Sequence, residues 1–360
     1  MDQAAIQSAP KKRIEYIDAL RGFTMILVVF YHISLMSFGT DSSFVNQLFM
    51  SFRMPLFFFI SGFIGYKANV VWNGKTWWSM SKKKILIQLL PTFVFGLIYA
   101  YAYRHIDFKT FVMDFTKYGY WFTIVLLEMF LIVYTLNVLA YNSNPQILKR
   151  RQLIILILLS GLLFGAKYAL NILPFIGKLN NIFSLYCLFR YFPYFAFGYI
   201  CSMNKDGFYR ILDSRYFTFI VIALFAICFC LNQFYIYPNI SNSMILRISY
   251  HVLLIFIGLM GLLIVYNTFR VYQESFTADK KVGYALQYIG KRTLDIYLLH
   301  WFFLPVLPQL GNVLSDGKNV ALELLLGGGL SLVVVSLCLV VSNVLRTSPI
   351  LAKYLFGAKK

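Results

Sequence analysis

The chain has 360 residues and a formal net charge of +19, and 59% of its residues are hydrophobic while only 13% are charged. Its mean hydropathy of +0.69 excludes an ordinary soluble domain. Because apolar segments fill the whole length, residues 1–360 are predicted to form one integral membrane domain with no separate soluble part.

Apolar segments of about twenty residues recur along the chain, and each is long enough to cross a hydrocarbon core about 30 Å thick. They predict an all-α, polytopic bundle of about ten transmembrane helices. The expected spans are 18–38, 44–66, 85–103, 119–141, 152–172, 181–202, 216–236, 245–269, 289–311 and 320–345.

The basic residues predict the orientation. When alternate connections are assigned to one face, most of the 33 Lys and Arg residues fall on that face, for example at residues 11–13, 82–84 and 149–151. This bias places both termini in the cytoplasm, with tails at 1–13 and 346–360, and the protein in the plasma membrane. The basic face meets anionic lipid headgroups, so the net charge requires no nucleic-acid partner.

The first span carries the most informative pattern. Arg21 and His32 are eleven residues apart, which puts them on one helix face about 16 Å apart along the axis. A cation at the rim and an imidazole deep in the hydrocarbon suit a ligand with an anionic end and a reactive end. Asp18 lies on the same stripe and is expected to support Arg21. The alternative is that His32 only packs.

Two further charges fall within predicted spans. Arg53 lies midway along the second span at a depth close to that of His32, next to Pro55. It either tethers helices by pairing with a carboxylate or contacts an anion or oxyanion. Glu128, in the fourth span, must be paired or protonated if it is buried. It is expected either to pair with Arg53 or to bind sugar hydroxyls.

The ninth and sixth spans add further candidates. His300 is expected near the bilayer centre with Tyr297 one turn below it, either in a structural hydrogen bond or lining the same cavity as His32. Arg190 is a further candidate for the cavity lining, and its alternatives are to extend to the interface or to tether helices. Aromatic rings such as Trp121 would stack on sugar faces. The five cysteines lie within apolar spans without metal-ligand spacing, so we expect no metal site and no bound cofactor.

Several stretches together resemble the acyltransferase-3 family of integral membrane acyltransferases. The first contains Arg13, Asp18, Arg21 and the later His32, and the others lie at 52–63, 120–122, 190–199 and 290–300. They occur in the family's order, and the resemblance extends from about residue 13 to 345.

The resemblance implies transfer of an acyl group, usually acetyl from acetyl-CoA, to a hydroxyl of a carbohydrate or cell-envelope glycan. Acyl-CoA is then a co-substrate and the glycan a partner. The family's first-helix Arg and His correspond to Arg21 and His32, and its basic stretch before the third span corresponds to Lys82, Lys83 and Lys84. Family members tend to have arginines there, and lysine acts as a point charge rather than as a bidentate donor.

These observations predict a mechanism and a geometry. His32 acts as the base or as a transient acyl carrier, and Arg53 stabilises the oxyanion. His32, Arg53, Glu128 and His300 are expected to surround one polar cavity, with Arg21 and residues 82–84 at its cytoplasmic entrance. The alternative is a transporter or flippase without acyl chemistry. Transporters often consist of two repeated halves, and residues 1–180 share no duplicated motif with 181–345. The acceptor, the acyl chain length and the oligomeric state stay open.

Overall fold

The protein is represented by a computed structural model that describes residues 13–40, 43–170, 174–241, 243–317 and 319–357. Within these ranges all regular structure is helical, as expected for the fold class. The α-helices are α1 (Glu15–Ile33), α2 (Phe44–Gly65), α3 (Gly74–Arg104), α4 (Phe108–Met113), α5 (Trp121–Leu139), α6 (Pro145–Ala166), α7 (Pro174–Phe183), α8 (Leu185–Met203), α9 (Lys205–Leu212), α10 (Phe217–Leu231), α11 (Met244–Val271), α12 (Lys281–Lys291), α13 (Thr293–Leu299), α14 (Pro308–Gly317), α15 (Val320–Leu345) and α16 (Pro349–Phe356).

Short π or 3₁₀ segments extend several of these helices. They are η1 (Ser34–Phe38), η2 (Lys117–Gly119), η3 (Lys167–Ala169), η4 (Asn232–Ile236), η5 (Gln273–Phe276) and η6 (His300–Phe302). Most of the expected N-terminal tail, residues 1–12, and the last three residues lie outside the described ranges.

The protein is a polytopic membrane helix bundle. In the described part of the chain, seven helices or helix pairs are long and apolar enough to cross a membrane: Glu15–Phe38, Phe44–Gly65, Gly74–Arg104, Trp121–Leu139, Phe217–Ile236, Met244–Val271 and Val320–Leu345. Large apolar side chains on the last three are widely exposed, and Leu325 on α15 is 74% exposed. A soluble protein rarely exposes such a surface, which is typical of helices that face lipid.

The other three expected spans differ from this pattern. α6 carries Lys149, Arg150 and Arg151 in its first two turns, and α8 contains Arg190 and several tyrosines. Neither contains a stretch as apolar and as poor in charge as those of the seven. The segment expected as one helix over 289–311 is interrupted. Arg292 leaves the helical conformation between α12 and α13, and η6 then ends the helical run.

The interruption has a local cause. Arg292 donates to Ser342 Oγ and Asn343 Oδ1 of α15, at 3.0 and 2.9 Å, which fixes the break against that helix. Beyond η6, Pro305 and Pro308 lack the N–H that a helix requires. Leu307 instead donates its N–H to Ser37 O of η1, at 3.0 Å, so the extended segment is bound to the end of α1.

Two close helix crossings place the central helices. A Cβ on Gly22 of α1 would overlap the carbonyl of Leu286 in α12, and one on Gly290 would overlap the carbonyl of Asp18. Gly62 of α2 and the glycine at 198 of α8 have the same reciprocal relation. Small residues allow this close backbone approach between membrane helices.

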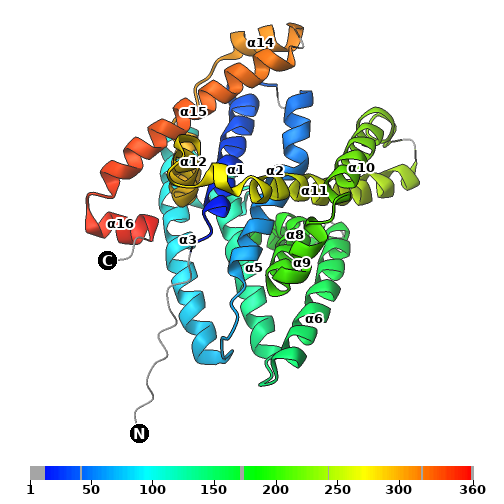
Figure 1. Ribbon diagram of the computed structural model, residues 1–360. Coiled ribbons are helices and arrows are strands. Elements are labelled where there is room, and N and C mark those ends of the chain that lie inside the picture. The colour runs from blue at the N-terminus through cyan, green and yellow to red at the C-terminus, as the bar shows by residue number, and fades with distance from the viewer. Residues whose placement is uncertain (1–12, 41–42, 171–173, 242, 318, 358–360) are drawn as a thin grey trace.

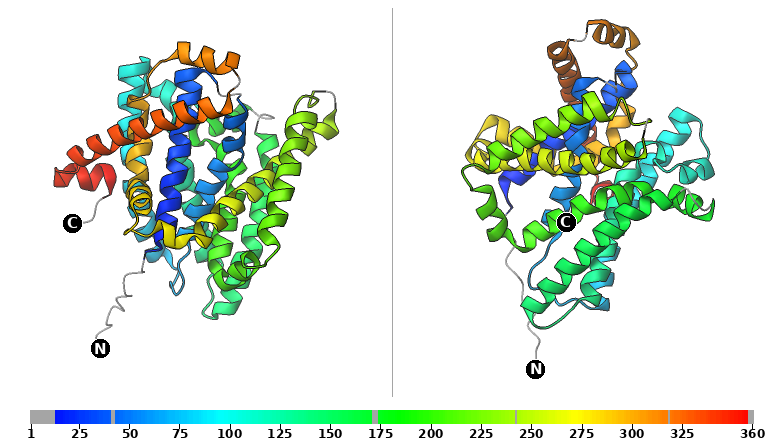
Figure 2. Two further views of the ribbon diagram at one scale, coloured as in Figure 1. Left: turned by 45° about the horizontal axis from the view of Figure 1, so that its top comes forward. Right: turned by 90° about the vertical axis from the view of Figure 1, so that its right-hand side faces the viewer.

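The arrangement of the elements follows from these crossings. α1, α2, α3 and α5 form the centre of the bundle, with α8 packed on α2 and α12 on α1 (Figure 1). α15 runs obliquely past α1, and α10 and α11 form an antiparallel pair on the other side, where α11 packs on α2 (Figure 2). α16 lies against α3, so the expected cytoplasmic tail at 346–360 contains a helix that packs on the bundle.

Candidate active site

α1 carries Arg21 in its N-terminal half and His32 one residue before its end. Both side chains line cavities, but different ones. The helical rise still separates them by about 16 Å. α1 therefore runs alongside a route from one cavity to the other, as the expected shared face requires.

The central cavity is the one that contains His32 and Arg53. It has a volume of ≈180 Å³, and no Asp or Glu among the described residues lines it. The helices α1, α2, α5 and α8, with α13, contribute its walls. Its lining residues are Met25, Val28, Tyr31, His32, Met50, Arg53, Met54, Phe57, Gly119, Trp121, Phe122, Tyr191 and Tyr297.

Arg53 is held by an aromatic ring instead of a carboxylate. Its side chain is 6% exposed, and its Cζ lies 4.1 Å from the centroid of the Tyr31 ring. Its Nε and Nη1 atoms are buried without a hydrogen-bond partner among the described residues. A buried cation with unused donors is costly unless an anion or another acceptor joins it. Arg53 is therefore poised to bind a negative charge in the cavity.

His32 contacts a second histidine. The centroid of its ring lies 5.1 Å from that of His300 and 4.3 Å from that of the Trp301 ring. His300 is fully buried and does not line the cavity. Its Nδ1 lies 3.0 Å from Ile296 O, and since a carbonyl only accepts, Nδ1 carries the proton. His300 Nε2 and His32 Nδ1 are both buried without a partner in the described structure.

The basic cavity lies at the other end of this route and has a volume of ≈660 Å³. Its charged lining residues are the cations Arg13, Arg21, Lys67, Lys83, Lys84, Lys291 and Arg346 and the carboxylate of Asp295. Phe356 and Gly357 of the C-terminal segment also line it. Residues from both ends of the described chain therefore meet here.

Some cations of the basic cavity are already engaged. Arg346 donates to both carboxylate oxygens of Asp295, at 2.8 and 2.9 Å. Arg21 donates to Thr293 Oγ1 at 2.8 Å and lies 3.5 Å from the buried Asp18. The remaining cations outnumber these carboxylates, so the cavity is strongly positive.

The expected lysine cluster divides between cavity and surface. Lys83 and Lys84 line the basic cavity, and Lys84 Nζ lies 3.6 Å from the centroid of the Phe130 ring. Lys82 is exposed and does not line the cavity. The difference arises because consecutive residues on a helix point about 100° apart.

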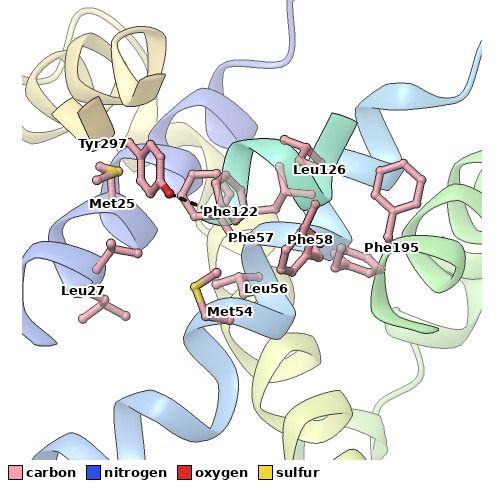
Figure 3. Close-up of a cluster of buried hydrophobic side chains, with 14 of the residues drawn as sticks. Met25, Leu27, Met54, Leu56, Phe57, Phe58, Phe122, Leu126, Phe195 and Tyr297 are labelled. Atoms are coloured by element: carbon pink, nitrogen blue, oxygen red, sulfur yellow. Dashed lines mark hydrogen bonds between the residues drawn. The ribbon is translucent and has the colours of Figure 1, made fainter. Parts of the chain in front are cut away.

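An aromatic partition, formed by Phe57, Phe122 and Tyr297, lines both the central and the basic cavity. The ring centroids of Phe57 and Phe122 are 4.9 Å apart. The Tyr297 hydroxyl donates to Gly119 O at 2.7 Å and accepts from the Phe122 N–H at 3.1 Å (Figure 3). These side chains therefore lie between the positive cavity and the one that contains His32.

The distal cavity adjoins the central cavity on its other side. It has a volume of ≈370 Å³ and shares Met50 and Tyr191 with the central cavity. Arg190 lines this distal cavity instead of lying beside His32, and Lys167 and His251 line it with Arg190.

Glu128 does not join these groups. It lines none of the three cavities described above, and both of its carboxylate oxygens are buried without a partner. No ion pair links it to Arg53 within the described ranges. Trp121 and Tyr297, in contrast, both line the central cavity as expected.

The sequence reasoning missed several lining residues. Tyr31 and Tyr191 are adjacent in sequence to the candidates His32 and Arg190. The chain has 26 tyrosines, and no sequence pattern distinguishes these two from the others. Lys291 lies near the start of an expected span and Arg346 at the start of the expected tail, where cations are expected by default. Their place in the cavity follows from the break at Arg292 and from the return of α16 to the bundle.

A family model described as an acyltransferase domain matches residues 14–342. The chain is also similar to glucans biosynthesis protein C of Salmonella paratyphi B, Salmonella heidelberg and Salmonella schwarzengrund. Each is 31% identical over 97 residues, covering 24% of this chain and 25% of the relative. The chain thus spans about a quarter of the length of the curated relatives it matches. No solved structure matches it.

Proposed function

Because the chain belongs to the acyltransferase-3 family of membrane acyltransferases, we propose that it transfers an acyl group, usually acetyl, from acyl-CoA to a hydroxyl of a carbohydrate or cell-envelope glycan. One observation carries the proposal. The central cavity, with His32 and the unpaired Arg53, lies between a strongly positive cavity and an aromatic one. The matched relatives are named for glucan biosynthesis, which supports a glycan acceptor.

The basic cavity is the proposed donor site. Acyl-CoA carries several phosphate charges, and Arg21, Lys83 and Lys84 supply cations for them. The pantetheine arm then passes the aromatic partition, whose side chains must rotate to let the thioester reach His32. Acyl-CoA is a co-substrate here, and no resident cofactor or metal is proposed.

The proposed chemistry needs a base and an anion-binding group. The acceptor hydroxyl loses its proton to the free ring nitrogen of His32 while its oxygen bonds to the thioester carbonyl carbon. The carbonyl oxygen takes up negative charge beside Arg53. The carbon–sulfur bond then breaks, the carbonyl re-forms, and the coenzyme A thiolate takes the proton from His32.

A two-step route uses the same residues. In it, the His32 nitrogen attacks the thioester first, coenzyme A leaves as the thiol, and the acceptor hydroxyl then displaces the imidazole. Rapid-quench labelling with radioactive acetyl-CoA distinguishes the two routes. Label on the protein before any acceptor is added indicates the two-step route.

His300 is a proposed positioning residue for His32. Its Nδ1–H bond to Ile296 leaves Nε2 as an acceptor, and the buried His32 Nδ1 lacks a partner nearby. Pairing of these two atoms would fix the tautomer with the proton on Nδ1 and leave His32 Nε2 as the base. His300→Gln, which keeps an acceptor, should retain more activity than His300→Leu and keep the wild-type pH profile of kcat. Equal loss in both variants would indicate a packing role.

We further propose that the 360 residues act as one unit in the plasma membrane. α6, α8 and the interrupted segment from α12 to α14 would complete ten crossings, with both termini cytoplasmic and the basic cavity facing the cytoplasm. Cysteine labelling of single-cysteine variants on intact cells tests this orientation.

Reconstitution of the purified protein in nanodiscs with radioactive acetyl-CoA and envelope glycans tests the function directly. We expect label in the glycan fraction. The transport alternative is tested in liposomes, where unmodified glycan would cross the bilayer without acyl transfer, and that outcome would overturn the proposal.

A further inference from the structure

Two basic side chains and no carboxylate are found among the described residues that line the distal cavity. Lys167 of η3 and Arg190 of α8 both line it, and no Asp or Glu does so among the described residues. Neither cation forms an ion pair within the described part of the chain. His251 of α11 is the third titratable nitrogen group of the lining. No described carboxylate therefore compensates the positive charge of the distal cavity.

Aromatic rings hold these cations in place. Lys167 is only 7% exposed, and its Nζ lies 3.7 Å from the centroid of the Phe164 ring and 4.8 Å from that of Tyr168. The Cζ of Arg190 lies 5.4 Å from the centroid of the Tyr191 ring. Cation–π contacts orient a charge but replace only part of its lost hydration. An anion that binds between them would replace the remainder of the lost hydration.

The remainder of the lining suits a sugar. Five tyrosines and several amides face the cavity, and Asn232 has a buried Oδ1 without a partner in the described structure. An amide oxygen of this kind accepts from a hydroxyl, and a flat ring covers the apolar face of a pyranose. The tyrosines are Tyr186, Tyr191, Tyr194, Tyr237 and Tyr250.

The position of the cavity links it to the chemistry. Met50 and Tyr191 line both the distal and the central cavity, so a molecule in the first adjoins His32 and Arg53 in the second. The donor side is occupied by the aromatic partition and the basic cavity. The distal cavity is therefore an approach to His32 and Arg53 that the proposed donor does not occupy.

We propose that the acceptor is an acidic glycan whose phosphate or carboxylate binds between Lys167 and Arg190, while a neighbouring sugar hydroxyl extends to His32. This inference rests on the proposed function, because it names the acceptor class of that same site. The same anionic chemistry is present in a phospholipid headgroup, and the experiment below separates the two sources.

The test measures binding without any acyl donor, so its outcome does not depend on the His32 chemistry. Maltopentaose and the same oligosaccharide carrying one 6-phosphate are titrated into the protein in phosphatidylcholine nanodiscs. Because hydrogen bonds to charged groups each contribute about 1.5–3 kcal/mol, we expect the phosphorylated sugar to bind roughly tenfold more tightly or better. Equal affinity for the two sugars would overturn the proposal.

Four variants locate the effect. Arg190→Gln and Lys167→Gln should each remove most of the preference while leaving the affinity for neutral maltopentaose near that of the wild type. Lys178→Gln changes an exposed cation on α7 outside the cavity and should leave the preference intact. His32→Ala should also keep the preference for the phosphorylated sugar. Failure of the proposed catalysis and failure of the acidic-glycan proposal are therefore distinguishable. A preference that survives in both cavity variants would contradict the assigned site.

Nanodiscs that contain phosphatidylglycerol test whether an anionic lipid headgroup occupies the distal cavity. If the anionic lipid occupies the cavity, the preference for the phosphorylated sugar disappears in them and returns in phosphatidylcholine. That result would assign the cavity to a lipid headgroup and overturn the acidic-glycan proposal. An unchanged preference in both lipids supports it.

Discussion

The basic cavity and the distal cavity are both positively charged, but they hold their cations differently. Asp18 and Asp295 pair with two arginines that line the basic cavity, and the other basic side chains around its volume of ≈660 Å³ outnumber these carboxylates. In the distal cavity, Lys167 and Arg190 contact aromatic rings, and no carboxylate is found among the described lining residues. The first arrangement suits a ligand with several phosphates, and the second suits a single acidic group on a sugar.

The largest effect is expected in the central cavity, which lies between the proposed donor and acceptor sites. His32→Ala should reduce acyl transfer by about 10²–10⁴-fold, because the hydroxyl then lacks a base. Binding of acetyl-CoA and of the phosphorylated oligosaccharide should stay within a few-fold of wild type, since His32 lines neither outer cavity. Labelled transfer assays and the two titrations measure this. Wild-type transfer by His32→Ala would remove the central cavity from the mechanism.

Arg53 should have the next largest effect. Arg53→Ala removes the unpaired cation of the central cavity and should lower kcat by about 10²–10³-fold, as loss of an oxyanion donor does elsewhere. KM for either substrate should change little. The control is Arg247→Ala, which removes an exposed arginine outside the three cavities. A loss confined to KM would instead assign Arg53 to substrate binding.

Arg21 tests the basic cavity alone. Arg21→Ala should raise KM for acetyl-CoA roughly tenfold, because a charge-assisted hydrogen bond contributes about 1.5–3 kcal/mol. Acceptor affinity should not change, and Arg21→Lys should recover part of the loss. Lys82→Ala is the matched control, since Lys82 is exposed and lies outside the cavity. An equal change in Lys82→Ala would show that general surface charge, and not the cavity, attracts the donor.

The smallest effect is expected at the aromatic partition. Tyr297→Phe leaves the Gly119 carbonyl and the Phe122 N–H without their shared hydroxyl, at a cost of about 1–3 kcal/mol in stability. Thermal unfolding in nanodiscs measures it as a lower midpoint, and Tyr284→Phe, on the exposed face of α12, is the control. An unchanged midpoint would mean that the partition does not depend on this hydroxyl.

The sequence predicted the elements better than their assembly. The 11-residue spacing of Arg21 and His32 was sufficient to place both on one route, because helical geometry is local. The central cavity is also lined by Arg53, Trp121 and Tyr297. The sequence had indicated Arg53 as a charge within a span, and the two aromatic residues as candidates for the same cavity. Their catalytic roles stay predictions.

What the sequence missed depends on distant contacts. The separation of Lys82 from Lys83 and Lys84 follows from the rotation of α3 against its neighbours. Arg190 lines the distal cavity because α8 is held against α2 by a pair of glycines, which hydropathy does not register. The interruption at Arg292 depends on partners fifty residues later in α15, and no window of twenty residues contains them.

The glycine crossings described above also bear on how such an enzyme can change. The helices of His32 and Arg53 are each locked to a partner at backbone distance, so nearly any substitution at Gly22 or Gly62 would displace a reacting group. The wall of the distal cavity formed by α10, η4 and α11 instead meets its neighbours through side chains. A Cβ on Gly258 of α11 would meet the Tyr194 hydroxyl, one on Gly261 would meet the Phe52 side chain, and much of the outer surface of this wall is exposed. Because side chains adjust more readily than backbone, we expect changes in this wall to alter the proposed acceptor site with little effect on the positions of His32 and Arg53.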